Sequence, residues 1–384
     1  MMNKRRLGWI GVGLCACALS SFLAVSLYMR PYRNLIKLTE AVEVLRENCI
    51  YVEEDWEPAD LLMSQLLASI GDRYTYYLSL HDAEDFSALY ETGGVHVGLG
   101  MEVVATRGGL RVGEVEVGSP AMMAGLQRGD IIQALDGKQV QNLDQIQGFA
   151  PDQLVELRVN REGRQVVLRA RAQEVSDQKE YVIHALPDGL VYLRIRSFMQ
   201  QGMEQEILTH LRAKEGEIKG LLIDVRANPG GRLDAAVAIA QAFLPEGSVI
   251  VYGEEKGRER ETITGGSETP LAMPVVILQD EESASAAEVL SGALRYNGRA
   301  TIVGQTSYGK GTMQRVHRLS DGSSIRYTCG RYYLPDGHSI DKTGIPPDVQ
   351  APRDASAPGW ALSEERDLQQ KKAQETLRSL CRLD

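Results

Sequence analysis

The chain has 384 residues, of which 43% are hydrophobic and 24% are charged, and its formal net charge is −10 at pH 7. These proportions are typical of globular domains and exclude a disordered, a collagen-like or a multi-spanning membrane protein. The negative charge argues against a nucleic-acid-binding protein, because such proteins need a basic surface to displace counterions from phosphates. At roughly 100–200 residues per domain, the length predicts two or three domains.

The cysteines indicate neither a disulfide framework nor a zinc site, because their number is odd and their spacing matches no ligand pattern. They are Cys15, Cys17, Cys49, Cys329 and Cys381. The sequence implies no metal and no other cofactor.

The N-terminus predicts a membrane anchor. The cations of Lys4–Arg6 precede the segment Leu7–Met29, which contains no charged residue. About 20 apolar residues suffice to cross the hydrocarbon core of a bilayer, whereas the apolar part of a cleavable signal peptide needs only roughly 7–15. We therefore expect an uncleaved signal anchor in residues 1–30, with cleavage as the alternative.

Hydrophobic periodicity divides the rest of the chain into a helical region, a strand-rich region and an alternating region. Helical spacing of apolar residues lies within residues 34–70. Strand patterns occur first at 101–104, 110–112 and 154–159, then at 191–195, 220–225 and 275–278. Helical patterns at 202–215, 233–243 and 285–296 separate the later strands, as in an α/β core, and a last helix is expected at 363–380.

A glycine-rich series marks the strand-rich region. It consists of Ser119-Pro120-Ala121, Ala124-Gly125-Leu126, Gly129-Asp130-Ile131-Ile132 and Asp136-Gly137-Lys138. This series resembles the core of a PDZ domain over roughly residues 93–172. In PDZ domains, backbone N–H groups of one loop hold the terminal carboxylate of a peptide, which adds as a strand to the sheet edge. The resemblance assigns that loop to Gly98, Leu99, Gly100 and Met101.

Two segments of the alternating region carry groups suited to acyl-transfer chemistry. The first, residues 224–231, follows a buried strand and ends in Pro229-Gly230-Gly231, a turn that exposes N–H groups and is a candidate oxyanion hole. The second, residues 282–288, pairs Ser285 with Glu288 in a capping-box pattern, which places Ser285 at a helix N-terminus. A serine there either only caps the helix or is a nucleophile, since the helix dipole favours an anion beside it.

A third segment, residues 304–311, nearly matches a phosphate-binding P-loop. Gly311 stands where that motif needs a hydroxyl, and residues 312–319 have an extended rather than a helical pattern. The nucleotide-binding interpretation is therefore rejected.

Taken together, these segments resemble the carboxy-terminal processing proteases, also called tail-specific proteases. The resemblance runs from about Tyr51 to Pro347 and includes residues 72–78, 332–340 and 344–348. It implies an α+β and α/β multidomain chain in which a PDZ domain is inserted before a crotonase- or Clp-like serine protease core. The implied divisions are residues 1–30 (anchor), 31–92 (helical region), 93–174 (PDZ domain), 175–353 (protease core) and 354–384 (C-terminal helical tail).

The resemblance also implies the site residues. It assigns Ser285 as nucleophile, Lys310 as general base and Gln314 as the residue that positions the lysine. Ser283 is the rival nucleophile, which only the family pattern excludes. The oxyanion donors are the N–H of Ala286 and that of Gly230 or Gly231, with the choice between the glycines open. A free lysine has a pKa of about 10.4, so the mechanism needs an environment that disfavours the ammonium.

The function that follows is an endopeptidase on the extracytoplasmic face of a bacterial cell membrane, which binds substrate C-termini through its PDZ domain. The alternative is a non-catalytic PDZ adaptor with a degenerate protease core. The helices expected at 34–70 and 363–380 offer surfaces through which two copies could form a homodimer. The physiological substrate is not encoded in these motifs.

Overall fold

The computed structural model describes residues 33–53, 57–83, 95–106, 108–116, 119–146, 148–176, 180–353, 362 and 366–383. The expected anchor at Leu7–Met29 lies outside these residues. Every helix in the described ranges is too short or too polar to cross a bilayer. The chain divides into two compact units, Met1–Ser79 and Leu80–Asp384.

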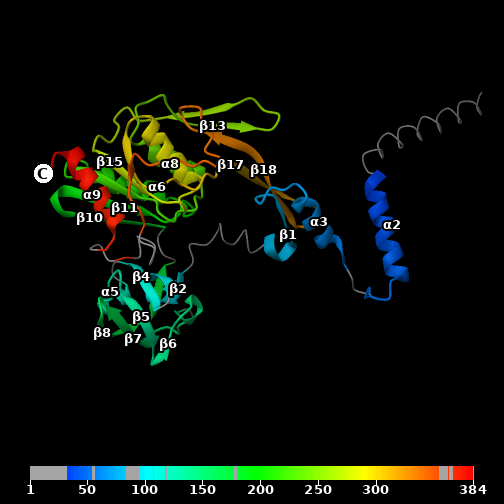
Figure 1. The fold of residues 1–384 in the computed structure, drawn as a ribbon, viewed down its shortest axis with the longest axis horizontal. Helices are drawn as coiled ribbons and strands as arrows, with labels where there is room; N and C mark the ends of the chain where they lie inside the picture. Colours follow the sequence, from blue (N-terminus) through cyan, green and yellow to red (C-terminus); the bar gives the residue numbers. More distant parts are fainter. Residues whose placement is uncertain are drawn as a thin grey trace, which may run out of the picture. The chain divides into compact units, whose positions relative to one another are not determined.

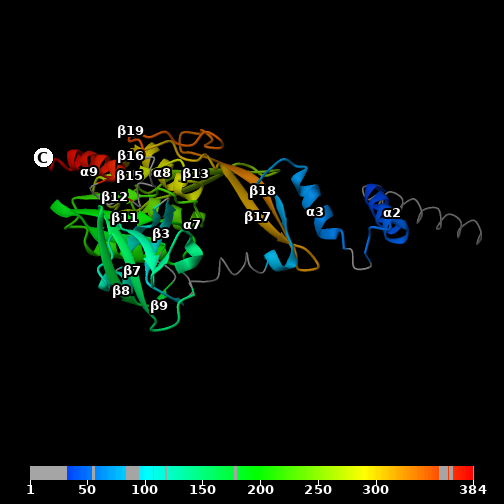
Figure 2. The same cartoon turned by 60° about the horizontal axis from the view of Figure 1, so that its bottom comes forward.

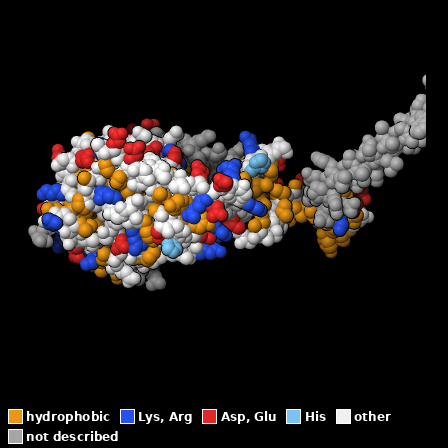
Figure 3. Space-filling view, turned by 90° about the horizontal axis from the view of Figure 1, so that it is seen from above, with side chains coloured by type: hydrophobic (Ala, Val, Ile, Leu, Met, Phe, Trp, Pro, Cys, Tyr) orange, Lys and Arg blue, Asp and Glu red, His pale blue; other side chains and the backbone are white. Residues whose placement is uncertain are grey.

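The first unit contains the predicted N-terminal helices. They are α2 (Arg33–Asn48) and α3 (Ala59–Ala68), followed by the short strand β1 (Tyr76–Leu78). Both helices expose apolar side chains, including Leu38, Val44 and Leu45 on α2 and Leu61 and Leu66 on α3. Hydrophobic side chains accordingly show on the surface of this segment in Figure 3.

The second unit begins with the β-rich domain. Its sheet has the order β3-β4-β5-β7-β8, with β6 paired to β5. The bounds are β3 (Met101–Thr106), β4 (Gly109–Val115), α5 (Pro120–Met123), β5 (Ile131–Leu135), β6 (Lys138–Gln139), η2 (Leu143–Ile146), β7 (Leu154–Arg161) and β8 (Arg164–Arg171). The entering strand β2 (Val95–Gly98) pairs antiparallel with the leaving strand β9 (Gln173–Ser176), so one two-stranded ribbon carries the chain in and out. A hydrophobic core of its own, from Leu99 to Ala172, marks this region as a domain.

A second six-stranded sheet forms the α/β core (Figure 1), with the order β10-β11-β12-β15-β16-β19. Its strands are β10 (Tyr181–Ala185), β11 (Leu190–Ile195), β12 (Gly220–Asp224), β15 (Val275–Gln279), β16 (Ala300–Gly304) and β19 (Val349–Gln350). All neighbours except β10 and β11 are parallel, so the carboxyl ends of β12, β15 and β16 meet at one edge. The predicted strands at 191–195, 220–225 and 275–278 are thereby confirmed.

Helices cover both faces of this sheet (Figure 2). The helices α6 (Met203–Ala213), α7 (Leu233–Gln241) and α8 (Ala286–Tyr296) share one core with alternate strand residues such as Leu193 and Ile223. The other set of alternate residues, such as Tyr192 and Leu222, packs on α9 (Leu368–Cys381). Asp367 caps α9 by accepting from the Gln370 N–H, so the described helix begins later than the expected residue 363.

An antiparallel sheet lies beside the core. It is built from β13 (Ser248–Glu255), β14 (Glu261–Gly265), β17 (Thr312–Arg318) and β18 (Ser324–Tyr333). The strand β18 pairs with both β13 and β17. Because β17 follows residues 304–311 directly, the extended conformation predicted after this near-P-loop is confirmed.

Candidate active site

Three loops converge at the carboxyl edge of the core sheet. The turn at 225–231 follows β12, residues 280–285 follow β15, and residues 305–311 follow β16. Ligands of open α/β sheets bind at this edge, because the loops there leave the sheet side by side. The three segments singled out by sequence are therefore brought together by the parallel strand order.

Ser285 lies at the start of α8, as the capping-box pattern predicted. Its N–H donates to Oε2 of Glu288 at 2.9 Å, which is the backbone half of that motif. Its backbone has φ 57° and ψ −115°, a conformation that costs an L-residue roughly 1–3 kcal/mol and persists where the surroundings enforce it. The residue is half-buried, so the sharp turn leaves part of it at the surface.

The rival serine, Ser283, is buried and fully engaged. Its Oγ donates to the carbonyl oxygen of Val225 at 2.8 Å and accepts from the Asp280 N–H at 3.0 Å. Only 1% of Ser283 is exposed. A hydroxyl in this position joins two loops, and it offers no access to a polypeptide.

The buried carboxylate of Glu288 connects the serine segment to the lysine segment. Its Oε1 accepts from the Ser307 hydroxyl at 2.6 Å and from the Gly309 N–H at 2.7 Å. Its Oε2 accepts from the N–H groups of Ser285 and Lys310, at 2.9 and 2.8 Å. Burial raises the pKa of Glu288, while the four donors oppose that shift.

Glycines on both sides of Lys310 let another loop approach its backbone closely. A Cβ at Gly309 would lie 2.8 Å from the Gly344 nitrogen, and one at Gly311 would lie 2.5 Å from the Asp341 nitrogen. The Lys342 N–H also donates to the Gly309 carbonyl oxygen at 2.8 Å. Packed backbone therefore surrounds the start of the half-buried Lys310 side chain.

Gln314 lies on β17, where the pairing with β18 shifts register between Met313 and Gln314. Its Nε2 donates to Oγ1 of Thr312 at 2.9 Å. The side chain is half-buried and held by its own strand.

The glycine turn packs against the nucleophile segment. A Cβ at Gly230 would lie 2.7 Å from Cβ of Ser285 and 3.1 Å from the nitrogen of Ala286, whereas one at Gly231 would meet the Phe198 backbone. Gly230 is thus the glycine that faces Ser285. In this structure the Gly230 N–H donates to Oδ1 of Asn228 at 2.8 Å.

Further hydrogen bonds fix this turn. The Ala284 N–H donates to the Asn228 carbonyl oxygen at 2.8 Å, and the Ala227 N–H donates to Oδ1 of Asp280 at 3.0 Å. Burial raises the pKa of Asp280. Ala286 is the first residue of α8, so its N–H has no acceptor inside the helix.

In the β-rich domain, Gly98 ends β2, Met101 begins β3, and Leu99 and Gly100 form the loop between them. The Leu99 and Gly100 carbonyl oxygens accept from the Ala121 and Glu116 N–H groups at 2.9 and 3.0 Å. This anchors the loop through its carbonyls. In the described sheet β3 is an end strand, as the addition of a peptide strand requires.

Sequence reasoning missed two contributions. The sequence pattern indicates Glu288 only as a helix cap, whereas in the structure its carboxylate also accepts from Ser307, Gly309 and Lys310. The pattern places Asn228 in a turn, and in the structure its buried amide also donates to the Ile195 carbonyl oxygen at 2.9 Å. Over the described ranges, no group of His, Cys, Asp and Glu side chains could hold a metal ion.

Comparison with known proteins identifies two domains. Residues 189–351 match the profile of peptidase family S41, and residues 111–161 match that of the PDZ domain. A carboxy-terminal-processing protease of Bartonella bacilliformis is 29% identical over 333 residues, which are 83% of this chain and 75% of that protein. A carboxyl-terminal-processing protease of Synechocystis sp. is 34% identical over 262 residues, which are 66% of this chain and 61% of that protein.

A solved structure is similar over most of its length. The photosystem II D1 C-terminal processing protease has 28% sequence identity and a TM-score of 0.50, and the match covers 87% of this chain and 92% of that one. The S41 match falls on the core that carries Ser285 and Lys310, and the PDZ match falls on the sheet from β4 to β7.

Proposed function

This chain belongs to the carboxy-terminal processing proteases and is a serine-type peptidase of family S41, and from that premise we propose how its parts act. We propose that its PDZ domain binds the C-terminus of a polypeptide and that Ser285 and Lys310 cleave a nearby peptide bond. One observation carries the proposal: a single buried carboxylate oxygen of Glu288 accepts from the backbone N–H groups of both Ser285 and Lys310.

In this mechanism the Ser285 hydroxyl attacks the scissile carbonyl carbon while the neutral Lys310 amine accepts its proton. The tetrahedral intermediate collapses when the lysine returns that proton to the leaving amine, which gives an acyl-enzyme that water then hydrolyses. A positioned general base contributes roughly 10²–10⁴-fold to such a reaction. Gln314 completes the catalytic group by positioning the lysine.

The oxyanion donors in this proposal are the N–H of Ala286 and that of Gly230 or Gly231. Gly230 is the better placed glycine, because it packs against Ser285. Its N–H serves this role when it turns from Asn228 Oδ1 toward the oxyanion. Each such donor contributes about 10²–10³-fold to the rate.

Substrate capture is assigned to the loop Gly98–Met101 and to the free edge of β3. The terminal carboxylate binds the loop N–H groups, and the peptide extends the sheet as an added strand.

The anchor at Leu7–Met29 holds the enzyme at the extracytoplasmic face of a bacterial membrane. The exposed apolar faces of α2 and α3 are the surfaces proposed for a homodimer.

Cleavage of an unfolded reporter with an apolar C-terminal tail tests the proposal. Full-length wild type is compared with Ser285→Ala and Lys310→Ala, and a reporter with a charged tail is the control. We expect tail-dependent cleavage by wild type only, and labelling of Ser285 by a fluorophosphonate. Retained cleavage by both variants would overturn the dyad, and absence of both cleavage and labelling in wild type would favour the adaptor.

A further inference from the structure

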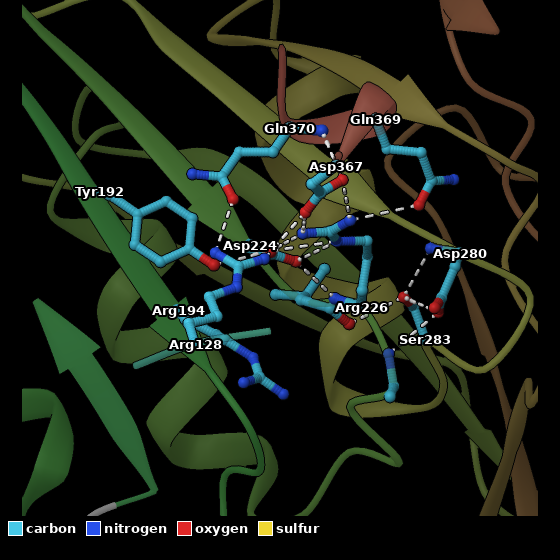
Figure 4. A network of polar contacts seen from close by, with 12 residues as sticks. Arg128, Tyr192, Arg194, Asp224, Arg226, Asp280, Ser283, Asp367, Gln369 and Gln370 are labelled. Carbon is cyan, nitrogen blue, oxygen red and sulfur yellow. Dashed lines mark hydrogen bonds and ion pairs between the residues drawn. The ribbon is translucent and has the colours of Figure 1, made fainter. Parts of the chain in front are cut away.

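A buried network of charges joins the PDZ domain, the C-terminal helix α9 and the turn at 225–231 (Figure 4). We infer that Asp367 and Arg128 are positioning residues, through which the docked PDZ domain holds the turn at Gly230 against Ser285. The inference rests on the proposed function, because it concerns the same active site. It assigns a role to the segment around Asp367, which lies beyond the S41 match at residues 189–351.

Asp367 is shared by two arginines from different parts of the chain. Its Oδ2 accepts from Arg226 and from Arg128 at 2.9 Å each, and its Oδ1 accepts from Arg226 at 2.9 Å. Arg128 lies in the PDZ domain between α5 and β5, and it also donates to Oε1 of Gln370 at 2.8 Å. One carboxylate therefore connects the PDZ domain to the end of β12.

The core side of the network is sealed from water. Asp224, Arg226 and Asp367 are each 0% exposed. Asp224 accepts from the Arg226 guanidinium at 2.6 Å and from the Tyr192 hydroxyl at 2.8 Å. Arg226 is held between the carboxylates of Asp224 and Asp367, and removing one partner of a buried ion pair is costly. In this inference a change at Asp367 therefore shifts Arg226 toward Asp224.

Arg226 is directly followed by the turn that packs on the nucleophile segment. The next residue, Ala227, donates its N–H to Asp280, and Asn228 accepts from the Ala284 N–H. Two residues further on, Gly230 lies against Ser285. A shift of Arg226 is therefore transmitted along the hydrogen-bonded backbone of residues 227–229 to Gly230.

The PDZ domain meets the same network at a second point. Glu102 on β3 accepts from Arg194 at 2.9 Å and from Arg196 at 2.9 Å. Arg194 is 1% exposed and lies opposite Asp224 in the β11–β12 pairing. The PDZ domain thus contributes one anion and one cation to the network.

Arg128→Gln is the informative variant. The Arg128 side chain lies at the edge of the network and is 15% exposed, and in this variant Asp367 keeps Arg226 as its partner. Arg169→Gln is the matched control, since Arg169 makes an exposed ion pair with Glu156 on the same domain. Arg128→Lys tests whether a cation alone suffices. The measurements on the full chain are kcat and KM for tail-dependent cleavage, the rate of Ser285 labelling, and hydrogen exchange of residues 226–231.

We expect Arg128→Gln to lower kcat and the labelling rate about tenfold, which is within the range that small misplacement causes, with KM changed less than twofold. Exchange at residues 226–231 becomes faster, Arg128→Lys recovers part of the rate, and Arg169→Gln matches wild type. Wild-type kcat and labelling in Arg128→Gln would overturn the inference and leave the proposed function standing. A raised KM with unchanged kcat would also overturn it, because Arg128 would then serve peptide capture.

If wild type neither cleaves nor labels, the proposed function fails, and hydrogen exchange alone decides the inference. Faster exchange at residues 226–231 in Arg128→Gln than in Arg169→Gln supports the coupling of Arg128 to the turn. Equal exchange in the two variants overturns it.

Discussion

Glu288 accepts the main-chain N–H of Lys310 at 2.8 Å, although the two residues are 22 positions apart. Glu288 lies in the first turn of α8, and Lys310 lies in the loop that follows β16. The same oxygen accepts the N–H of Ser285 at 2.9 Å. The relative position of the proposed nucleophile and base is therefore set by one carboxylate, which four donors hold in place. Capping of α8 and assembly of the site are two functions of a single side chain.

Glu288→Gln is expected to lower kcat by at least roughly 10²-fold, because it displaces backbone at both proposed catalytic residues. The amide offers one acceptor oxygen, and its NH₂ group faces donors. Each donor left without an acceptor costs roughly 1–3 kcal/mol of unfolding free energy. Cleavage assays and urea unfolding measure the two effects.

Glu281→Gln is the matched control, because Glu281 precedes the same helix but is about half exposed and pairs with Arg353 at the surface. This control should keep wild-type kcat and stability. Equal kcat values for the two glutamine variants would show that Glu288 does not assemble the site.

The raised pKa of Glu288 predicts a pH dependence of stability. Between the ordinary carboxyl pKa and the raised folded value, the folded chain binds more protons than the unfolded chain. Its free energy of unfolding therefore falls as pH rises through that window. Glu288→Gln has no titrating carboxyl group at this position and therefore lacks this pH dependence. The difference in unfolding free energy between wild type and variant should narrow as pH rises. A difference that widens would show that the four donors outweigh burial.

Much of the core was predictable from local pattern. Nearly continuous apolar runs marked β11, β12 and β15, since strands covered on both faces carry apolar residues at most positions. The spacing of Ser285 and Glu288 correctly placed the start of α8, because a capping box is a local motif. Parallel strand order then brings the three loops to one edge.

The longer-range contacts could not be predicted in this way. Asp367 is separated from Arg226 by 141 residues and from Arg128 by 239, and no local motif pairs them. The hydrogen bond from the Gly230 N–H to Asn228 could not be predicted either. The same Pro-Gly-Gly sequence is compatible with a turn whose N–H is exposed and with one whose N–H is already hydrogen-bonded. Such contacts are set by tertiary packing.

Ser283→Ala and Ser285→Ala should have opposite effects, the first on stability and the second on labelling and cleavage. Ser283→Ala removes the side-chain acceptor of the Asp280 N–H, and it leaves the Val225 carbonyl oxygen with the Asn228 N–H as a donor. This should cost roughly 1–3 kcal/mol of unfolding free energy while fluorophosphonate labelling persists. Ser285→Ala should abolish labelling and cleavage with little loss of stability. Thermal melting and mass spectrometry of the labelled protein measure both. Labelling of Ser283 would reverse the assignment.

Gly230→Ala is expected to abolish cleavage, because its φ of 102° disfavours a side chain and its Cβ would lie 2.7 Å from Cβ of Ser285. Gly247→Ala is the control: its φ is 80°, yet nothing lies within 4 Å of the added Cβ. Both variants carry a backbone strain of roughly 1–3 kcal/mol, so melting temperatures should fall in both. Only Gly230→Ala should lose Ser285 labelling. Equal labelling rates would mean that the turn can retreat without disturbing the nucleophile, and contact between Gly230 and Ser285 would then have no part in catalysis.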